Sequence, residues 1–265
     1  MIYDTIINGL PVEAEYSDSF INEVALPLLR RLTELQREKD RRIIVYMAAP
    51  PGAGKTTLSE FLAGLSRENE DTTDITAIGM DGFHRYQDYL LTHDILRDGK
   101  SIRMVDVKGT PETFDLKLMT ERISALTTKS TVGWPSYDRT THNPRENAVY
   151  VNGKIVLIEG NYLLLKEKGW DKLRDFADFT IKIDADPEML RERLLSRKIA
   201  TGVTPKKAEE FVDFSDMYNV NLCLNKSAEA DLKLMLKADG DYVVKSGTDT
   251  KGKTDEIHFE KRITY

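Results

Sequence analysis

Cysteine is almost absent from this chain: its 265 residues contain one, Cys223. A disulfide within the chain and a cysteine-based zinc site are therefore both excluded, since each needs more than one thiol. Long apolar runs are missing as well. The best stretch, residues 155–165, is interrupted by Glu159 and Asn161 and is shorter than the roughly 18 apolar residues of a membrane-spanning helix. The sequence predicts neither a disulfide scaffold nor a membrane protein.

Positive charge is also in deficit, with 38 Lys and Arg against 44 Asp and Glu and a net charge of -6. A chain with this balance is a poor electrostatic match for nucleic acid or an anionic membrane, although a local basic pocket for a small anion is compatible with it. The first residues carry acids and no long apolar stretch, so no signal peptide is predicted and we expect a cytoplasmic protein. A hydrophobic share of 40% and a charged share of 31% are typical of globular chains.

The hydrophobic pattern divides the chain into three regions. Residues 1–42 predict a hairpin with an Asn-Gly turn at 8–9, followed by an amphipathic helix from Ser17. That helix either pads a sheet or makes a homodimer contact, and the sequence leaves both open. Residues 43–240 predict the main domain, and residues 241–265 predict a hairpin-like tail packed on the same domain.

Strands and helices alternate along the central region. This order predicts an α/β fold in which a mainly parallel sheet lies between two layers of helices. Apolar runs predict strands at 43–49, 75–80, 155–158, 179–183 and 231–237, and apolar periodicity predicts helices at 55–65, 86–97, 112–127, 187–200 and 205–224.

Residues 49–56, APPGAGKT, match the phosphate-binding pattern G-x-x-x-x-G-K-[ST], with Ala49 in place of the first glycine. Glycines permit a tight turn whose N–H groups point at phosphate oxygens, and the following helix presents its positive end to the anion. Lys55 is expected to reach the β- and γ-phosphates of ATP, and the Thr56 hydroxyl is expected to ligate Mg²⁺. The predicted nucleotide-binding residues are Pro51, Gly52, Ala53, Gly54, Lys55, Thr56 and Thr57.

Two acids stand at predicted strand ends. Asp81 follows the strand at 75–80, and Glu159 follows the strand at 155–158. The carboxyl ends of parallel strands line one crevice, so we expect both acids to converge on the phosphate loop. One carboxylate would help to hold Mg²⁺ and the other would accept a proton from an attacking hydroxyl. The alternative for each is an acid that faces solvent.

A basic cluster falls on the predicted helix at 187–200. Arg193 and Arg197 are four residues apart and share a face. They predict a lid, at about 190–205, that folds guanidinium groups over the triphosphate. The glutamates interleaved with them predict a solvated charged face equally well, and the sequence does not choose.

Four segments occur together in an order that resembles the P-loop kinases of the uridine kinase, phosphoribulokinase and bacterial pantothenate kinase superfamily. The chain is similar in particular to its nucleoside/nucleotide kinase-like, or fructose-transport kinase-like, branch over roughly residues 43–236. The segments are GKT at 54–56, MDGFH at 80–84, WPSYDR at 134–139 and VLIEGNY at 156–162. The chain also resembles this branch at two further segments, KGTPETFD at 108–115 and DMYN at 216–219.

The resemblance implies ATP- and Mg²⁺-dependent phosphorylation of a hydroxyl on a small molecule. It implies that Asp81 takes the acceptor proton, that Glu159 lies near Mg²⁺, and that Arg193 and Arg197 belong to a lid. Asp81 is followed by Gly-Phe-His instead of the Ser-Phe-Tyr typical of uridine kinases, a departure that bears on nucleoside specificity.

The acceptor is expected to lie near the polar segment 137–142. The resemblance implies contacts from Tyr137 and His142. Apart from the resemblance, the polar side chains of this segment are chemically suited to binding sugar hydroxyls or a phosphate. The candidate acceptor-binding residues are Asp81, His84, Tyr137, Asp138, Arg139, His142 and Glu159.

A sugar or sugar-like acceptor is favoured, and a nucleoside comes next, for which Trp134 would either stack on the ring or pack in the core. The rival prediction is a nucleotide-binding regulatory ATPase without a small-molecule acceptor, although the chain lacks the Asn-Lys-x-Asp guanine signature of GTPases.

Overall fold

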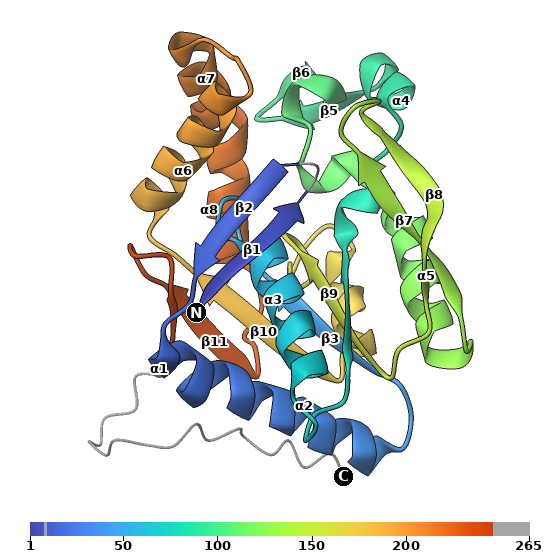
Figure 1. Ribbon diagram of the computed structural model, residues 1–265. Helices are drawn as coiled ribbons and strands as arrows, with labels where there is room; N and C mark the ends of the chain where they lie inside the picture. Colours follow the sequence, from blue (N-terminus) through green and yellow to red (C-terminus); the bar gives the residue numbers. More distant parts are fainter. Residues whose placement is uncertain (8–9, 246–265) are drawn as a thin grey trace.

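The computed structural model describes residues 1–7 and 10–245 (Figure 1). The main sheet of this part of the chain has six strands in the order β12-β11-β10-β3-β9-β4. Neighbouring strands pair in parallel, except that β12 is antiparallel to β11. The strands are β3 (Ile43–Ala48), β4 (Ile75–Gly79), β9 (Ile155–Gly160), β10 (Phe179–Asp184), β11 (Leu232–Leu236) and β12 (Tyr242–Val244).

Strand β3 lies inside this sheet and is buried along its whole length. Its odd-numbered residues join one apolar cluster, with the N-terminal helices, α3 and α6. Its even-numbered residues join a second cluster on the other face, with α5 and strand β7. Because both faces are covered, the strand is apolar at every position and not at alternate ones. This arrangement confirms the three-layer α/β fold with a mainly parallel sheet.

Most predicted helices are confirmed. The helix predicted at 112–127 starts later, because Asp115 caps its first turn by accepting the Leu118 N–H at 3.0 Å. The helix predicted at 205–224 is α7 and α8 joined through a π-helical turn at Val212–Asp216. The helices are α3 (Lys55–Glu68), α5 (Leu116–Thr128), α6 (Pro187–Ala200), α7 (Pro205–Phe211) and α8 (Met217–Lys226).

The helix predicted at 86–97 is wrong in its second half. Helix α4 (Gln87–Thr92) ends early, and the chain turns into a hairpin of β5 (Asp94–Arg97) and β6 (Lys100–Arg103). Asp98 and Gly99 form its two-residue turn, with φ values of 50° and 74°. A turn of this kind matches the twist of paired strands, so Asp-Gly stops the helix. A second hairpin, β7 (Val132–Asp138) with β8 (Asn143–Val151), was not predicted.

The predicted N-terminal hairpin is confirmed as the antiparallel pair β1 (Ile2–Ile7) and β2 (Leu10–Glu15), while its turn at 8–9 lies outside the described residues. Ser17 caps the helix that follows by accepting the Phe20 N–H at 3.0 Å. That helix comprises α1 (Asp18–Phe20), a π-helical turn (Ile21–Ala25) and α2 (Leu26–Lys39).

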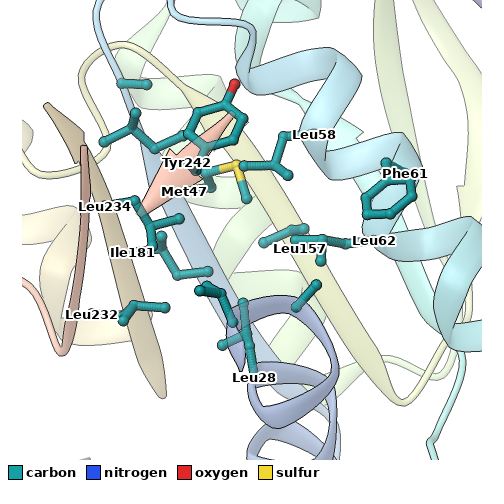
Figure 2. Close-up of a cluster of buried hydrophobic side chains, with 14 of the residues drawn as sticks. Leu28, Met47, Leu58, Phe61, Leu62, Leu157, Ile181, Leu232, Leu234 and Tyr242 are labelled. Carbon is teal, nitrogen blue, oxygen red and sulfur yellow. The ribbon is translucent and has the colours of Figure 1, made fainter. Parts of the chain in front are cut away.

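The N-terminal helix packs on one face of the sheet (Figures 1 and 2). Leu28 and Leu32 are both 1% exposed, and Figure 2 shows Leu28 beneath the side chains of β9, β10 and β11. Of the predicted tail, β12 joins the main sheet, and residues 246–265 lie outside the described part. None of the helices formed by residues 1–7 and 10–245 is long and apolar enough to cross a bilayer.

Candidate functional site

The glycine-rich loop connects the carboxyl end of β3 to α3. Gly52 and Gly54 have φ values of 83° and 75°, a region in which side chains are strained. Gly54 precedes α3, and the first bond into the helix runs from the Leu58 N–H to the Gly54 carbonyl at 3.0 Å. The N–H groups of residues 55–57 therefore have no partner within the helix. Free N–H groups and a helix N-terminus together make an anion-binding geometry.

A threonine–glutamate pair adjoins this loop. The Thr56 hydroxyl donates a hydrogen bond of 2.8 Å to Oε1 of Glu159, which lies on β9 beside β3. Burial raises the pKa of Glu159, and the nearby Asp81 charge acts in the same direction, against Lys55 and the Thr56 hydroxyl. Because burial destabilises the charged form of this carboxylate, a cation bound beside it would stabilise it.

The pair suits Mg²⁺ in its chemistry. Among the described residues, no three His, Cys, Asp or Glu side chains gather into a metal-ligand group. Magnesium in phosphoryl-transfer sites is held by one or two protein oxygens, with phosphates and water completing its shell. Thr56 and Glu159 supply oxygens of this kind next to the free N–H groups of the loop.

Asp81 sits on a 3₁₀ turn, Met80–Phe83, directly after β4. Its carboxylate is 3.5 Å from a guanidinium nitrogen of Arg139, and its side chain is 44% exposed. Desolvation acts to raise the pKa of Asp81, but the nearby His84 and the charges of Lys55, Arg139 and Arg197 outweigh it and lower that pKa. The fold therefore gathers cations from three separate segments around one carboxylate.

His84 is fixed by the same turn. Its Nδ1 lies 2.8 Å from the Asp81 carbonyl oxygen, which only accepts, so Nδ1 carries the proton. The ring lies 4.0 Å from the ring of Phe114 and 5.0 Å from that of Tyr137. Burial lowers the pKa of His84, and Lys108 adds to this effect, so the ring is neutral at pH 7 with Nε2 free to accept a hydrogen bond.

The β7–β8 hairpin carries the other predicted acceptor residues. Lys108 lies over the Tyr137 ring, with Nζ 5.0 Å from its centre, and burial raises the pKa of Tyr137 to about 12. Asp138 instead closes the hairpin turn by accepting the Thr140 N–H at 2.8 Å. The His142 side chain is exposed, and its carbonyl accepts a 3.2 Å hydrogen bond from Lys108.

The two predicted lid arginines lie on α6 in different surroundings. The charge of Arg197 acts on Asp81 and helps to lower the pKa of that carboxyl. The Arg193 guanidinium lies 3.9 Å from the position that a Cβ would take at Gly240, on the side of β12. Arg191, in contrast, pairs with Asp213 at 2.7 Å and ties α6 to the helix after it.

The turn that carries Asp81 is held against β7 by close packing. A Cβ at Gly82 would lie 2.1 Å from the Pro135 carbonyl oxygen, so only glycine fits. Trp134 is buried, donates from its indole nitrogen to the Gly79 carbonyl at 2.9 Å, and meets the Phe83 ring edge-on at 4.8 Å. Its role is core packing, the second of the two predicted alternatives.

The site includes two residues that sequence reasoning did not select. Lys108 holds Tyr137 and the His142 carbonyl, and its place in the segment 108–115 was the available signal. Tyr242 donates a 2.8 Å hydrogen bond to the Ala53 carbonyl inside the phosphate loop. No motif marks this tyrosine, because its contact with the loop joins residues 189 positions apart.

Comparison with known proteins gives a consistent result. The model of the "Phosphoribulokinase / Uridine kinase family" matches residues 44–204. The uncharacterized protein YggC of Escherichia coli (strain K12) is 39% identical over 91% of this chain and 98% of its own length. A uridine kinase of Lactobacillus johnsonii is 26% identical over 60% of this chain and 69% of its own.

A solved structure agrees with the fold. That of a proposed fructose transport system kinase from Silicibacter sp. TM1040 has a TM-score of 0.67 at 29% identity. The alignment covers 77% of this chain and 98% of that one.

Proposed function

Because the chain belongs to the phosphoribulokinase/uridine kinase family, we propose that it is an ATP- and Mg²⁺-dependent kinase that transfers the γ-phosphate to a hydroxyl of a small molecule. The observation that carries this proposal is the position of Asp81. Its carboxylate lies among Lys55, Arg139 and Arg197, at the sheet edge that also holds the phosphate loop. A base surrounded by cations next to a phosphate site is what phosphoryl transfer to a hydroxyl requires.

The nucleotide would be held by the loop between β3 and α3. The N–H groups of Gly52 and of residues 54–57 and the Lys55 ammonium would bind the phosphates, with Pro51 and Ala53 shaping the turn; the Ala53 N–H itself donates to the Pro50 carbonyl at 3.3 Å. Bound Mg²⁺ would neutralise charge on the β- and γ-phosphates. The oxygens of Thr56 and Glu159, 2.8 Å apart, would hold the ion or its waters.

Asp81 is assigned as the base. The acceptor hydroxyl gives its proton to the Asp81 carboxylate as its oxygen bonds to the γ-phosphorus, and the bond from that phosphorus to ADP breaks. The lowered pKa of Asp81 keeps the carboxylate ionised at neutral pH. Lys55 and the lid residues Arg193 and Arg197 would stabilise charge on the transferring group and exclude water.

The acceptor is proposed to be a sugar or a sugar-like polyol. His84, Tyr137 and Arg139 surround Asp81 with polar groups suited to hydroxyls, with Asp138 and His142 further along the hairpin. A nucleoside is second. Trp134, the ring that would stack on a base, is 1% exposed and engaged with the core.

The experiment measures ADP release from MgATP, alone and with a panel of sugars, sugar phosphates, nucleosides and pantothenate. A kinase gives turnover that depends on one acceptor class. Turnover that ignores every acceptor supports the rival, a regulatory nucleotide-binding ATPase.

Two substitutions refine this test. Asp81→Asn should lower acceptor-dependent turnover by about 100-fold or more while MgATP still binds, because a general base contributes about 10²–10⁴. Lys55→Ala should abolish transfer for a different reason, because it removes the ammonium group that is proposed to bind the phosphates of ATP. The control Asp88→Asn removes an exposed carboxylate on α4 and should leave turnover unchanged. Full turnover by Asp81→Asn would contradict the assigned base.

A further inference from the structure

The phosphate loop is contacted from outside by one side chain of the last described strand. The Tyr242 hydroxyl, on β12, donates a buried 2.8 Å hydrogen bond to the carbonyl of Ala53, in the middle of the loop. Burial raises the pKa of Tyr242, so the phenol keeps its proton and remains a donor. Tyr242 lies outside the span 44–204 that the family model matches.

This bond fixes the orientation of one peptide group. In a trans peptide the C=O and the following N–H point in opposite directions, and the described residues contain no cis peptide. With the Ala53 carbonyl directed at Tyr242, the Gly54 N–H points away from it. Gly54 is exposed, and its N–H makes no hydrogen bond among the described residues.

Gly54 is also the residue that lets the phenol approach. A Cβ at this position would lie 2.7 Å from the Tyr242 hydroxyl oxygen, a contact that side chains do not tolerate. The glycine therefore serves two needs at once, its positive φ and the room for the phenol. Glycine is also the residue whose backbone is least restrained by itself, so an external hydrogen bond has most effect here.

Tyr242 is in turn held by both ends of the described chain. It pairs with Leu236 of β11, and its ring lies 6.4 Å from the Tyr16 ring and 5.7 Å from the Phe20 ring. The neighbouring Asp241 accepts a 2.5 Å hydrogen bond from the Ser17 hydroxyl. Figure 2 shows the Tyr242 ring beside Met47 and Leu58, with its oxygen directed away from the apolar cluster.

We infer that Tyr242 is a positioning residue for the nucleotide: by holding the Ala53 carbonyl outward, it keeps the Gly54 N–H directed at the phosphates. The inference rests on the proposed nucleotide site. It gives the N-terminal extension and β12 a part in that site, since Tyr16, Phe20 and Ser17 support Tyr242.

The test measures the Kd of MgATP by isothermal titration calorimetry. Tyr242→Phe removes the hydroxyl and keeps the ring. The Kd should rise about fivefold, the factor to which one net hydrogen bond of about 1 kcal/mol corresponds. Replacing Tyr242 with 4-aminophenylalanine, which restores a donor at the same place, should return the Kd toward the wild-type value. Tyr46→Phe is the matched control: this tyrosine is buried on the other face of the sheet and its hydroxyl makes no hydrogen bond among the described residues, so the Kd should not change.

The melting temperature of each variant separates positioning from support. If the Tyr242 hydroxyl has a purely structural role, Tyr242→Phe will melt at a lower temperature than the wild type but bind MgATP with the wild-type Kd. That result would overturn the inference and leave the proposed function standing. A wild-type protein that does not bind MgATP would overturn the proposed function as well.

A second measurement uses the unmodified protein and needs no substitution. The Gly54 amide should exchange its hydrogen rapidly in the free protein and gain protection when MgATP binds. A Gly54 amide that exchanges equally fast in both states would also overturn the inference.

Discussion

Asp81 follows β4 and Glu159 lies near the end of the neighbouring strand β9, at the same sheet edge, yet their ionisation is shifted in opposite directions. Asp81 is surrounded by cations, which lower its pKa despite desolvation. Glu159 is 6% exposed, and burial raises its pKa despite Lys55. Two carboxylates with separated pKa values suit two different tasks, and here one is assigned to proton transfer and the other to the metal.

The raised pKa of Glu159 has a consequence for stability. An acid whose pKa is raised on folding binds more protons in the folded state, so stability falls as pH rises from about 4, the unfolded value, through the raised value. At pH 8 the free protein therefore carries a buried charge at a cost. Glu159→Gln removes that charge and keeps an oxygen that accepts from Thr56.

We expect Glu159→Gln to melt a few degrees higher than the wild type at pH 8, because about 1 kcal/mol of added stability corresponds to about 2–4 °C in melting temperature. The gain in melting temperature should be smaller at pH 5. Kinase turnover should fall, since the carboxylate is lost from the metal site. Differential scanning calorimetry at both pH values checks this. A gain of equal size at pH 5 and pH 8 would show that ionisation of Glu159 is not the cause.

At the scale of elements, the site depends on a close approach between the turn after β4 and the hairpin β7–β8. Gly82 permits it, because any Cβ there would lie 2.1 Å from the Pro135 carbonyl oxygen, which belongs to the backbone and cannot rotate away. Gly64, inside α3, has no such neighbour: a Cβ there would be 3.9 Å from the Tyr3 ring.

Gly82→Ala should therefore destabilise the protein by more than about 2 kcal/mol, as overpacking against rigid atoms does, and should raise the KM for the acceptor by moving Asp81 relative to Arg139. Gly64→Ala should instead stabilise it by up to about 1 kcal/mol, because alanine is the better helix former. Urea denaturation measures both, and equal effects of the two substitutions would contradict this account.

The two hairpins missed by the strand prediction show where local patterns fall short. Residues 94–97 continue a helical pattern, and only the Asp-Gly turn at 98–99 ends it. Strand β8 is mostly exposed, so it lacks the apolar alternation by which a half-buried strand is recognised. The buried strands β3 and β9, apolar except for Glu159 and Gly160 at the end of β9, were predicted to within two residues.

At the scale of the whole molecule, the division at residues 42–43 does not separate two cores. The N-terminal helix contributes Phe20, Leu28, Leu32 and their neighbours to the same apolar cluster as β3 and α3. Removing it would expose to water the part of this sheet face that the helix covers, at about 25 cal/mol for each Å² of apolar surface.

We therefore expect a fragment of residues 43–240 to lack a cooperative unfolding transition, whereas the full chain should unfold in one step. Near-ultraviolet circular dichroism and tryptophan fluorescence, followed through the same thermal scan, give the comparison. A fragment that melts cooperatively near the wild-type temperature would establish residues 1–42 as a separable extension.

The sequence by itself determined the local chemistry and the layered fold. The glycine spacing at 52 and 54, the lysine and threonine after it, and the acids after two apolar strands predicted the phosphate loop and the convergence of Asp81 with Glu159. These features follow from periodicity and strand direction, which act over a few residues and along one sheet edge.

Only the tertiary structure decided which distant groups complete the site. It brought Arg139 and Arg197 to Asp81, set the pKa of Asp81 and that of Glu159 in opposite directions, and placed Tyr242 against Ala53. The burial of a residue and the charges around it depend on segments far apart in the chain. The spacing of neighbouring residues in the sequence therefore does not predict them.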